Sequence, residues 1–435
     1  MFAIVAFGLL VCWSNAVGGL ILAQLKALGW TDNSTTATFS AITTAGMFLG
    51  ALVGGIIGDK TGRRNAFILY EAIHIASMVV GAFSPNMDFL IACRFVMGVG
   101  LGALLVTLFA GFTEYMPGRN RGTWSSRVSF IGNWSYPLCS LIAMGLTPLV
   151  SAAWNWRLQL LIPAILSLIA TALAWRYFPE SPRWLESRGR YQEAEKVMRS
   201  IEEGVIRQTG KPLPPVVIAD DGKAPQAVPY SALLTGVLLK RVILGSCVLI
   251  AMNVVQYTLI NWLPTIFMTQ GINLKDSIVL NTMSMFGAPF CIFIAMLVMD
   301  KIPRKTMGVG LLILIAVLGY IYSLQTSMLL ITLIGFFLIT FVYMYVCYAS
   351  AVYVPEIWPT EAKLRGSGLA NAVGRISGIA APYAVAVLLS SYGVTGVFIL
   401  LGAVSIIVAI AIATIGIETK GVSVESLSID AVANK

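Results

Sequence analysis

The sequence carries little charge and a single histidine. Charged residues make up only 11 % of the 435 residues, whereas hydrophobic residues make up 57 %. A soluble protein usually carries charge on about a quarter of its residues, because water has to solvate its surface. Most of this surface must therefore face lipid, which excludes a soluble enzyme or a soluble binding protein.

Motifs for nucleotide, metal or disulfide chemistry are also missing. The absence of a GxxxxGK[ST] segment argues against an ATP-driven pump. The six cysteines lie in apolar stretches without CxxC spacing, which favours small buried hydrophobes over disulfides or metal ligands. The sequence has no catalytic constellation. We therefore expect no enzyme activity, no cofactor, no metal site and, because the basic residues lie between apolar stretches, no nucleic-acid partner.

Twelve apolar stretches are each long enough to cross a bilayer. A spanning helix needs roughly 20 mostly apolar residues for a core about 30 Å thick, and it satisfies its own backbone hydrogen bonds there. The sequence thus predicts an all-α integral membrane protein. The first stretch begins at Met1 without a basic leader, so it reads as a span and points to a start codon further upstream. The stretches lie at about 2–25, 35–58, 66–84, 87–111, 123–149, 156–178, 241–267, 277–299, 306–324, 327–353, 366–390 and 393–417.

Basic residues follow every second span. They gather after spans 2, 4, 6, 8 and 10, whereas the opposite loops offer only Lys26, Arg157 and Lys275. The positive-inside rule therefore places both termini in the cytoplasm. We expect an N-terminal six-helix half at 1–178, a cytoplasmic loop with short helices and a linker at 179–239, a C-terminal six-helix half at 240–418 and a cytoplasmic tail at 419–435.

Charged landmarks recur between the two halves at nearly one spacing. Four pairs are separated by 238 to 244 residues, which is hard to obtain by chance. Parallel repeats of this kind are typical of transporters whose site lies between the halves, near the middle of the membrane. The pairs are Asp59 with Asp300, Glu114 with Glu356, Arg121 with Arg365, and Glu180 with Glu418.

Four segments carry a resemblance to a known family. Gly58 to Arg64 resembles the loop 2–3 signature of the major facilitator superfamily, and Arg94 to Gly102 resembles its arginine–glycine motif in span 4. Pro179 to Leu185 and Pro355 to Gly366 are similar to the sugar-porter signatures after spans 6 and 10. The chain looks closest to bacterial metabolite:proton symporters of the sugar-porter and organic-ion-porter type. The resemblance implies a monomeric carrier in the bacterial inner membrane that moves a small organic solute by alternating access, with protons as a possible co-substrate.

The resemblance also implies a role for charges at the cytoplasmic helix ends. In the family such pairs latch the two halves together when the site faces outward, and inward opening breaks them. Exposed pairs contribute only about 0–1 kcal/mol each, so a gate needs a network. The alternative is ordinary positive-inside topology charge. The candidates are Asp59, Arg63, Arg64, Glu114, Arg121, Glu180, Arg183, Asp300, Arg304, Glu356 and Arg365.

Arg375 is the most informative charge within a span. It lies ten residues past Arg365, hence about 15 Å into span 11. Ionisable groups at such depth are costly and are functional candidates. A guanidinium is the natural partner of a carboxylate, and organic-anion porters have an arginine in the same part of span 11. We therefore favour an organic anion as substrate, the alternative being a structural arginine bonded to helix carbonyls.

Amide and aromatic side chains in the inner spans complete the candidate pocket. Ligand sites combine apolar and aromatic walls with a few convergent polar groups. Each of these residues could instead be a packing or interfacial residue. The candidates are Asn15, Asn133, Trp134, Asn253, Gln256, Tyr257, Asn261, Tyr345 and Tyr348.

Proton coupling has fewer candidates. The resemblance links Arg94 to coupling, with a structural role as the alternative, and Arg127 can snorkel to the interface. Glu71 and His74 could form a proton relay or a structural pair, and the structural pair is favoured because span 3 is peripheral. Many relatives carry an acid in span 1 where this chain has Asn15. Coupling could therefore use another group, follow the substrate's own protonation, or be absent.

The sequence thus predicts a secondary transporter for a carboxylate-bearing metabolite. A neutral-sugar porter is the second hypothesis, because sugar porters share the Pro179 to Leu185 motif. A transporter-like sensor that binds solute without moving it is the third.

Overall fold

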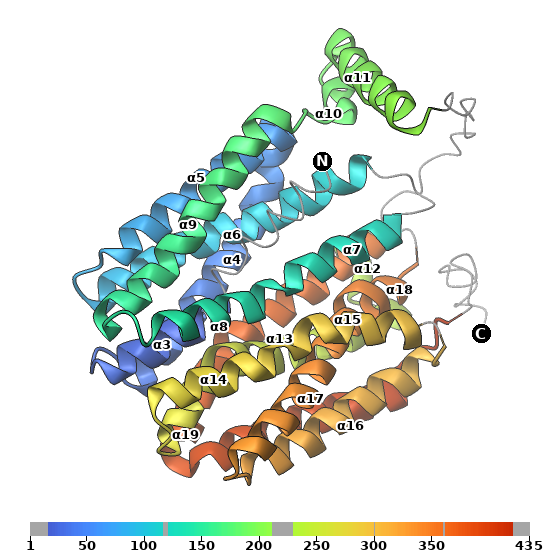
Figure 1. Cartoon of the computed structure of the whole chain (residues 1–435). Helices are drawn as coiled ribbons and strands as arrows, with labels where there is room; N and C mark the ends of the chain where they lie inside the picture. The colour runs from blue at the N-terminus through green and yellow to red at the C-terminus, as the bar shows by residue number, and fades with distance from the viewer. Residues whose placement is uncertain (1–15, 116–120, 211–228, 300, 360–361, 421–435) are drawn as a thin grey trace.

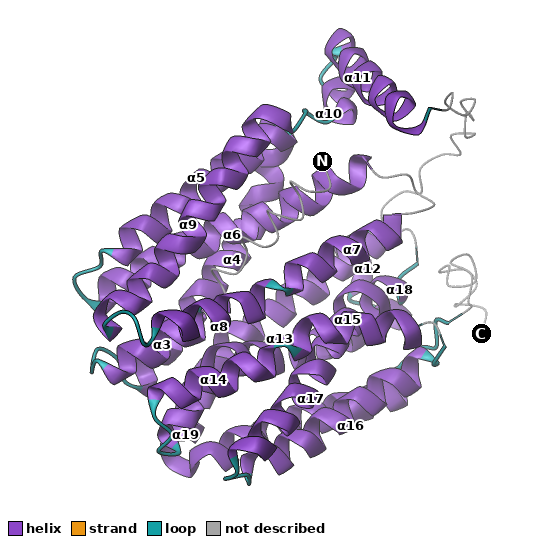
Figure 2. Ribbon diagram, viewed as in Figure 1, coloured by secondary structure: helices purple, strands orange, loops and turns teal. Residues whose placement is uncertain are grey.

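The computed structural model describes residues 16–115, 121–210, 229–299, 301–359 and 362–420. Within these ranges the chain is almost entirely helical and contains no strand (Figure 2). The all-α prediction is confirmed for this part of the chain.

The helices form two bundles that lie side by side (Figure 1). The first bundle contains α3 (Gly18–Ala27), α4 (Asn33–Thr61), α5 (Arg63–Ala82), α6 (Met87–Tyr115), α7 (Arg121–Asn133), α8 (Ser135–Leu146) and α9 (Ala152–Tyr177). The second contains α13 (Gly236–Thr269), α14 (Leu274–Met285), α15 (Gly287–Val298), α16 (Arg304–Ser323), α17 (Met328–Cys347), the π-helix η2 (Tyr348–Tyr353), α18 (Val354–Glu356) and α19 (Lys363–Ile415).

Three short helices connect the bundles: α10 (Pro182–Ser187), α11 (Tyr191–Thr209) and α12 (Tyr230–Leu233). Figure 1 shows α10 and α11 beyond the end of the spanning helices. We call this end of the bundles, where α4 gives way to α5, the basic end, and the opposite end, where α3 gives way to α4, the far end.

Nine helices in the described ranges are long and apolar enough to cross a membrane. The difference from the twelve expected spans has three sources. Much of the first expected span falls in residues 1–15, outside the described ranges. The fifth expected span is broken at Trp134 into α7 and α8, and the last two run on as α19 through a non-helical Gly393 with φ of 64°. Twelve crossings therefore stay a prediction.

Glycines let α4 and α6 cross at backbone contact. A Cβ added at Gly50 would overlap the carbonyl oxygen of Val99, and one added at Gly102 would overlap that of Met47. Small residues allow this approach between membrane helices, where packing rather than water exclusion drives association. The glycines of the span 4 motif thus have a packing reason in this chain.

The two bundles touch most extensively along three helix pairs, α3 with α13, α4 with α19 and α8 with α14, and less extensively where α7 packs on α15 and α3 on α14. The tightest of these crossings involves Gly19, where an added Cβ would overlap the carbonyl oxygen of Ile260. The bundle interface therefore has little spare room at the start of α3.

We predict that Gly50→Ala destabilises the protein. Its methyl group has no space against Val99, and overpacking of a tight contact typically costs about 1–3 kcal/mol. Thermal unfolding of the purified protein in detergent would measure the loss. Gly55→Ala on the same helix is the matched control, because nothing lies within 4 Å of its Cβ position. Equal stability of the two variants would contradict the proposed crossing.

Candidate functional site

The basic end of the second bundle holds a compact ionic cluster. Arg304 forms two bonds with Glu356, with Nε–Oε2 at 3.1 Å and Nη2–Oε1 at 3.2 Å, and Thr419 donates to Glu356 at 2.6 Å. Glu418 accepts the backbone N–H groups of Arg304 at 2.7 Å and Lys305 at 3.1 Å. These N–H groups belong to the first turn of α16, where the helix leaves donors unpaired.

Several opposing effects act on the Glu418 carboxyl. Burial by itself raises its pKa, but the backbone N–H donors of Arg304, Lys305 and Lys420 and the Arg304 charge outweigh burial. The pKa is therefore lowered from its ordinary value. The carboxylate form holds the start of α16 against the end of α19.

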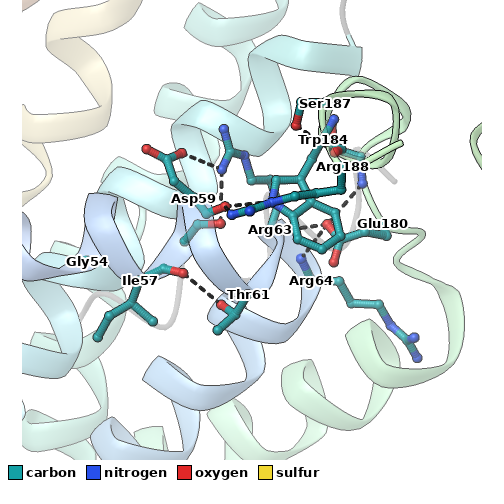
Figure 3. A network of polar contacts seen from close by, with 12 residues as sticks. Gly54, Ile57, Asp59, Thr61, Arg63, Arg64, Glu180, Trp184, Ser187 and Arg188 are labelled. Carbon is teal, nitrogen blue, oxygen red and sulfur yellow. Dashed lines mark hydrogen bonds and ion pairs between the residues drawn. The ribbon is translucent and has the colours of Figure 1, made fainter. Parts of the chain in front are cut away.

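The first bundle repeats this contact. Glu180 accepts the backbone N–H groups of Arg63 at 2.6 Å and Arg64 at 3.2 Å, in the first turn of α5 (Figure 3). Glu180 and Glu418 belong to one pair of the sequence repeat. The repeat therefore has a physical meaning: the acid after the sixth span of each half caps the third span of that half.

Asp59 anchors α10 to the end of α4. Its carbonyl oxygen accepts the indole N–H of Trp184 at 2.8 Å and a guanidinium N–H of Arg188 at 2.9 Å, while its carboxylate pairs with Arg63 at 2.7 Å (Figure 3). Arg183 lines a cavity of about 390 Å³ beside these groups. The short helix α10 thus belongs structurally to the first bundle.

The other predicted gate residues are placed as follows. Arg64 donates to the carbonyl of Trp175, and Arg365 lies over the ring of Tyr230 at 5.2 Å. Asp300 and the side chains of Glu114 and Arg121 lie outside the described part of the chain. The ion pairs described above each join helices of one bundle, so a latch between the halves stays a prediction.

Arg375 is partly buried on α19, the helix that packs on α13 within the second bundle and on α4 of the first bundle. Its Nη1 atom is buried and has no hydrogen-bond partner. Two flanking glycines mark the neighbours of this stretch of α19. A Cβ at Gly374 would lie 3.0 Å from the Asn253 amide nitrogen, and one at Gly378 would lie 3.3 Å from both the Tyr257 ring and Thr44. The structure thus brings this stretch of α19 together with two of the predicted pocket residues of span 7.

The remaining span 7 candidates lie on the same helix, α13. Asn253 is buried and donates to the carbonyl of Leu249 at 2.7 Å, whereas Gln256 and Tyr257 are partly buried. Asn261 is buried at the crossing with α3, its side-chain oxygen 3.0 Å from the Cβ position of Gly18. Asn261 therefore belongs to the interface between the bundles.

Two predicted pocket tyrosines lie inside the second bundle. Tyr345 is 1 % exposed and donates to the carbonyl of Val248 at 3.1 Å. Tyr348 is fully buried between the rings of Tyr345 at 5.8 Å and Tyr353 at 5.1 Å. This placement favours packing over substrate contact for both residues.

The span 5 candidates lie where α7 gives way to α8. The Asn133 amide donates to the carbonyl of Ser129 in its own helix at 2.8 Å. Trp134 is 37 % exposed, and its ring lies edge-on to Phe286 of the other bundle at 6.3 Å. Asn15 lies outside the described residues.

Sequence reasoning missed an aromatic contact between the bundles. The rings of Tyr136 on α8 and Tyr343 on α17 lie 5.0 Å apart at 64°, and Tyr343 is 3 % exposed. Tyr343 and the predicted pocket residue Tyr345 are two positions apart on one helix, so their side chains point to nearly opposite sides. Nothing in the sequence marked α17 as turned this way.

The coupling candidates are buried in the first bundle. Arg94 is 1 % exposed, donates to the Thr43 hydroxyl at 3.2 Å and lies over the Phe39 ring at 4.5 Å. Glu71 and His74 are both fully buried, with Nδ1 and Oε2 3.7 Å apart. Arg127 is exposed, as expected for a snorkelling side chain.

Comparisons with known proteins agree on one family. Residues 2–382 match the family model described as Major Facilitator Superfamily. The chain is 99 % identical over 435 residues, covering 100 % of this chain and 95 % of the relative, to the Escherichia coli K12 protein named "Putative metabolite transport protein YdjK". It is 43 % identical over 431 residues, covering 98 % and 94 %, to the protein of the same strain named "Inner membrane metabolite transport protein YdjE".

A solved structure has the same fold. The partially occluded inward-open form of the xylose transporter XylE from E. coli matches with a TM-score of 0.76 at 17 % identity, covering 97 % of this chain and 98 % of that one. The predicted fold class of two related helical halves is confirmed by this match together with the repeated caps.

We predict that Glu418→Gln lowers stability at neutral pH. Because the pKa of Glu418 is lowered from 4.5, the stabilisation is complete above that value and is lost as the pH falls through the lowered one. After allowance for solvent screening, we expect a loss of about 1 kcal/mol at pH 7. Thermal unfolding in detergent at stepwise lower pH would measure it.

The matched control is Glu203→Gln, which changes an exposed acid on α11. It should unfold like the native protein at every pH. A difference between Glu418→Gln and the native protein that persists unchanged in acid would contradict the role of the charge.

Proposed function

The chain belongs to the major facilitator superfamily, and from that premise we propose that it carries an organic anion whose carboxylate binds Arg375. Membership of this superfamily and similarity to metabolite transport proteins make the chain a multi-pass transporter of small metabolites in the bacterial inner membrane. The proposal concerns the kind of metabolite, the residues that bind it and the energy that drives it.

The Nη1 atom of Arg375, which is buried and has no hydrogen-bond partner, carries the proposal. A buried charge costs several kcal/mol unless a partner compensates it. Among the residues that the structure describes, no carboxylate pairs with Arg375, and its Nη1 atom has no acceptor. A carboxylate ligand would supply both the charge and two parallel acceptors that fit a guanidinium.

The neighbours of Arg375 suit an organic anion. Tyr257 of α13 and Thr44 of α4 lie beside Gly378, three residues further along α19, and offer an aromatic ring and a hydroxyl-bearing side chain there. Such a mixture of a charged anchor, few polar groups and aromatic walls is typical of small-molecule sites. An acid with a ring or a polyhydroxyl chain fits these neighbours.

The name of one relative points in the same direction. The chain is 28 % identical over 386 residues, covering 88 % of this chain and 85 % of the relative, to the niacin transporter NiaP of Acinetobacter baylyi. Niacin is an aromatic carboxylic acid. This relative supports an aromatic acid as one member of the substrate class.

A neutral-sugar porter is the second candidate. The Pro179 to Leu185 motif is shared with sugar porters, and the XylE structures belong to a xylose transporter. In that case Arg375 would bond helix carbonyls or water and would not decide specificity.

Proton symport is part of the proposal. One XylE structure is titled a proton:xylose symporter, and the resemblance of the chain to metabolite:proton symporters implies the same driving force. Because Asn15 replaces the usual acid of span 1, the proton would use another group or travel on the substrate's carboxyl group.

We predict that Arg375→Gln abolishes carboxylate uptake. Truncating one partner of a buried charge pair costs about 2 kcal/mol or more, which corresponds to roughly a 30-fold loss or more. Uptake of radiolabelled nicotinate, gluconate and xylose into proteoliposomes would measure it. Arg176→Gln, which removes an exposed arginine at the end of α9, is the charge-matched control.

The outcomes separate the hypotheses. Nicotinate or gluconate uptake that is lost in Arg375→Gln and kept in Arg176→Gln supports the anion site. Xylose uptake that survives Arg375→Gln supports the neutral-sugar porter. Binding of any of these solutes without accumulation supports the sensor hypothesis and contradicts the proposal that the protein carries them.

We predict that an inward-directed proton gradient raises substrate accumulation. A co-transported proton adds its own free energy to the substrate gradient, so a protonophore should return accumulation to the level without a gradient. The same proteoliposomes with and without a protonophore provide the measurement. Accumulation that ignores the gradient would rule out proton symport and leave the anion site untouched.

A further inference from the structure

Two hydrogen bonds of the same kind join the bundles. The Asn33 amide on α4 donates to the Ser390 hydroxyl on α19 at 2.9 Å. The Asn281 amide on α14 donates to the Ser140 hydroxyl on α8 at 3.1 Å. In both cases an asparagine of one bundle reaches a serine of the other.

The sequence repeat relates the helix pairs that these two bonds join. Helix α4 forms the expected second span of the first half, and α14 forms the first part of the expected second span of the second half. Each of the two helices begins with a side-chain cap. Asp32 accepts the Thr35 N–H at 2.7 Å, and Asn273 accepts the Asp276 N–H at 2.8 Å. These caps are 241 residues apart, the spacing of Asp59 and Asp300.

The acceptor helices follow the same relation. Ser140 lies on α8 in the expected fifth span, and Ser390 lies on α19 in the expected eleventh, which is the fifth span of the second half. Each asparagine thus joins the second span of one half to the fifth span of the other. Asn33 stands at the start of its helix, whereas Asn281 lies seven residues beyond Leu274, the first residue of α14, about 10 Å deeper.

Neighbouring hydrogen bonds fix which group donates and which accepts in the Asn33–Ser390 bond. Lys26 donates to the Asn33 side-chain oxygen at 3.0 Å, which leaves the amide N–H group to face Ser390. The Ser390 hydroxyl in turn donates to the Ala386 carbonyl at 2.8 Å, so its lone pairs are available to Asn33. The hydrogen bonds therefore run in one direction, from Lys26 on α3 through Asn33 to Ser390 on α19.

The two ends of the molecule differ in how the bundles are joined. The Asn33–Ser390 bond ties α4 to α19 at the far end, and α3 packs on α13 at Gly19, eight residues before the end of α3. At the basic end the described ion pairs, such as Arg304 with Glu356, stay within one bundle. The side-chain hydrogen bonds described between the bundles are therefore Asn33–Ser390 and Asn281–Ser140, and neither lies among the ion pairs of the basic end.

We propose that two hydrogen bonds, Asn33–Ser390 (the outer latch) and Asn281–Ser140 (the inner latch), close the far end and break together when that end opens. The inference rests on alternating access by this family and not on the anion bound at Arg375. Each asparagine gains water as its partner when the far end opens, so each bond biases the equilibrium only modestly. A net contribution of 0.5–1.5 kcal/mol per bond corresponds to about a 2- to 10-fold shift in the ratio of open to closed far ends.

Distance measurement between spin labels tests this without any substrate. Ser34 and Ser391 are exposed neighbours of the outer latch, and labels on cysteines at these positions would report far-end opening in nanodiscs, in a chain whose native cysteines are replaced. Asn281→Ala and Ser140→Ala, at the distant inner latch, should each raise the ratio of long to short distances about 2- to 10-fold. Combining them should add nothing, because they remove the same bond, whereas Lys301→Ala at the basic end should change nothing.

Cross-linking provides a second measurement that does not depend on the effect of removing a bond. Asn33→Cys with Ser390→Cys should form a disulfide with copper phenanthroline, hold the short distance and stop uptake until a reductant is added. Ser34→Cys with Ser391→Cys is the matched control and should cross-link far more slowly. Unchanged distances in Asn281→Ala and Ser140→Ala, or a cross-linked protein that transports normally, would overturn the proposal. Loss of carboxylate specificity alone would leave it standing.

Discussion

A polar group inside a bilayer has to find its partner within the protein, and this constraint organises the whole molecule. The hydroxyls of α4 return to their own helix: Ser40 donates to the carbonyl of Thr36, and Thr43 to that of Phe39. Backbone ends are closed by carboxylates, as Glu180 and Glu418 do for α5 and α16. Several buried polar atoms in the described part of the chain lack a hydrogen-bond partner, among them both polar side-chain atoms of Gln24 and the Nη1 atom of Arg375. Arg375 differs from Gln24 because its group is permanently charged, and a charge within a span is the costlier group to leave without a partner.

The architecture could be predicted from the sequence because it depends on regular features to which many residues contribute, so that no single position decides it. Apolar stretches of the right length, basic residues in alternate loops and charged pairs at one spacing led to two related helical halves. The spacing of Glu180 and Glu418 pointed to equivalent positions, although only the structure shows that both acids cap a helix. The packing reason for Gly102 likewise needs its partner, Met47, which lies far away in sequence.

The details of the site could not be predicted, and the reason is physical. A helix that is apolar on all sides has no polar face from which its rotation can be inferred. The sequence therefore offers Tyr345 and Tyr348 as pocket candidates, whereas Tyr343 of α17 makes the contact with Tyr136 of the other bundle. Contacts between halves, such as Asn33 with Ser390, join residues hundreds of positions apart and leave no local pattern.

The two repeated caps differ in one respect that bears on motion. The residue before α5 is Gly62, with φ of 94°, and the Glu180 carboxylate occupies the space where a side chain would stand. The equivalent residue before α16 is Pro303, whose ring fixes φ near its observed −56°. The turn before the third span is therefore made by glycine, the residue with the most backbone freedom, in one half and by proline, the residue with the least, in the other. When the two halves move during transport, we expect the first to bend at this turn and the second to move as a rigid body.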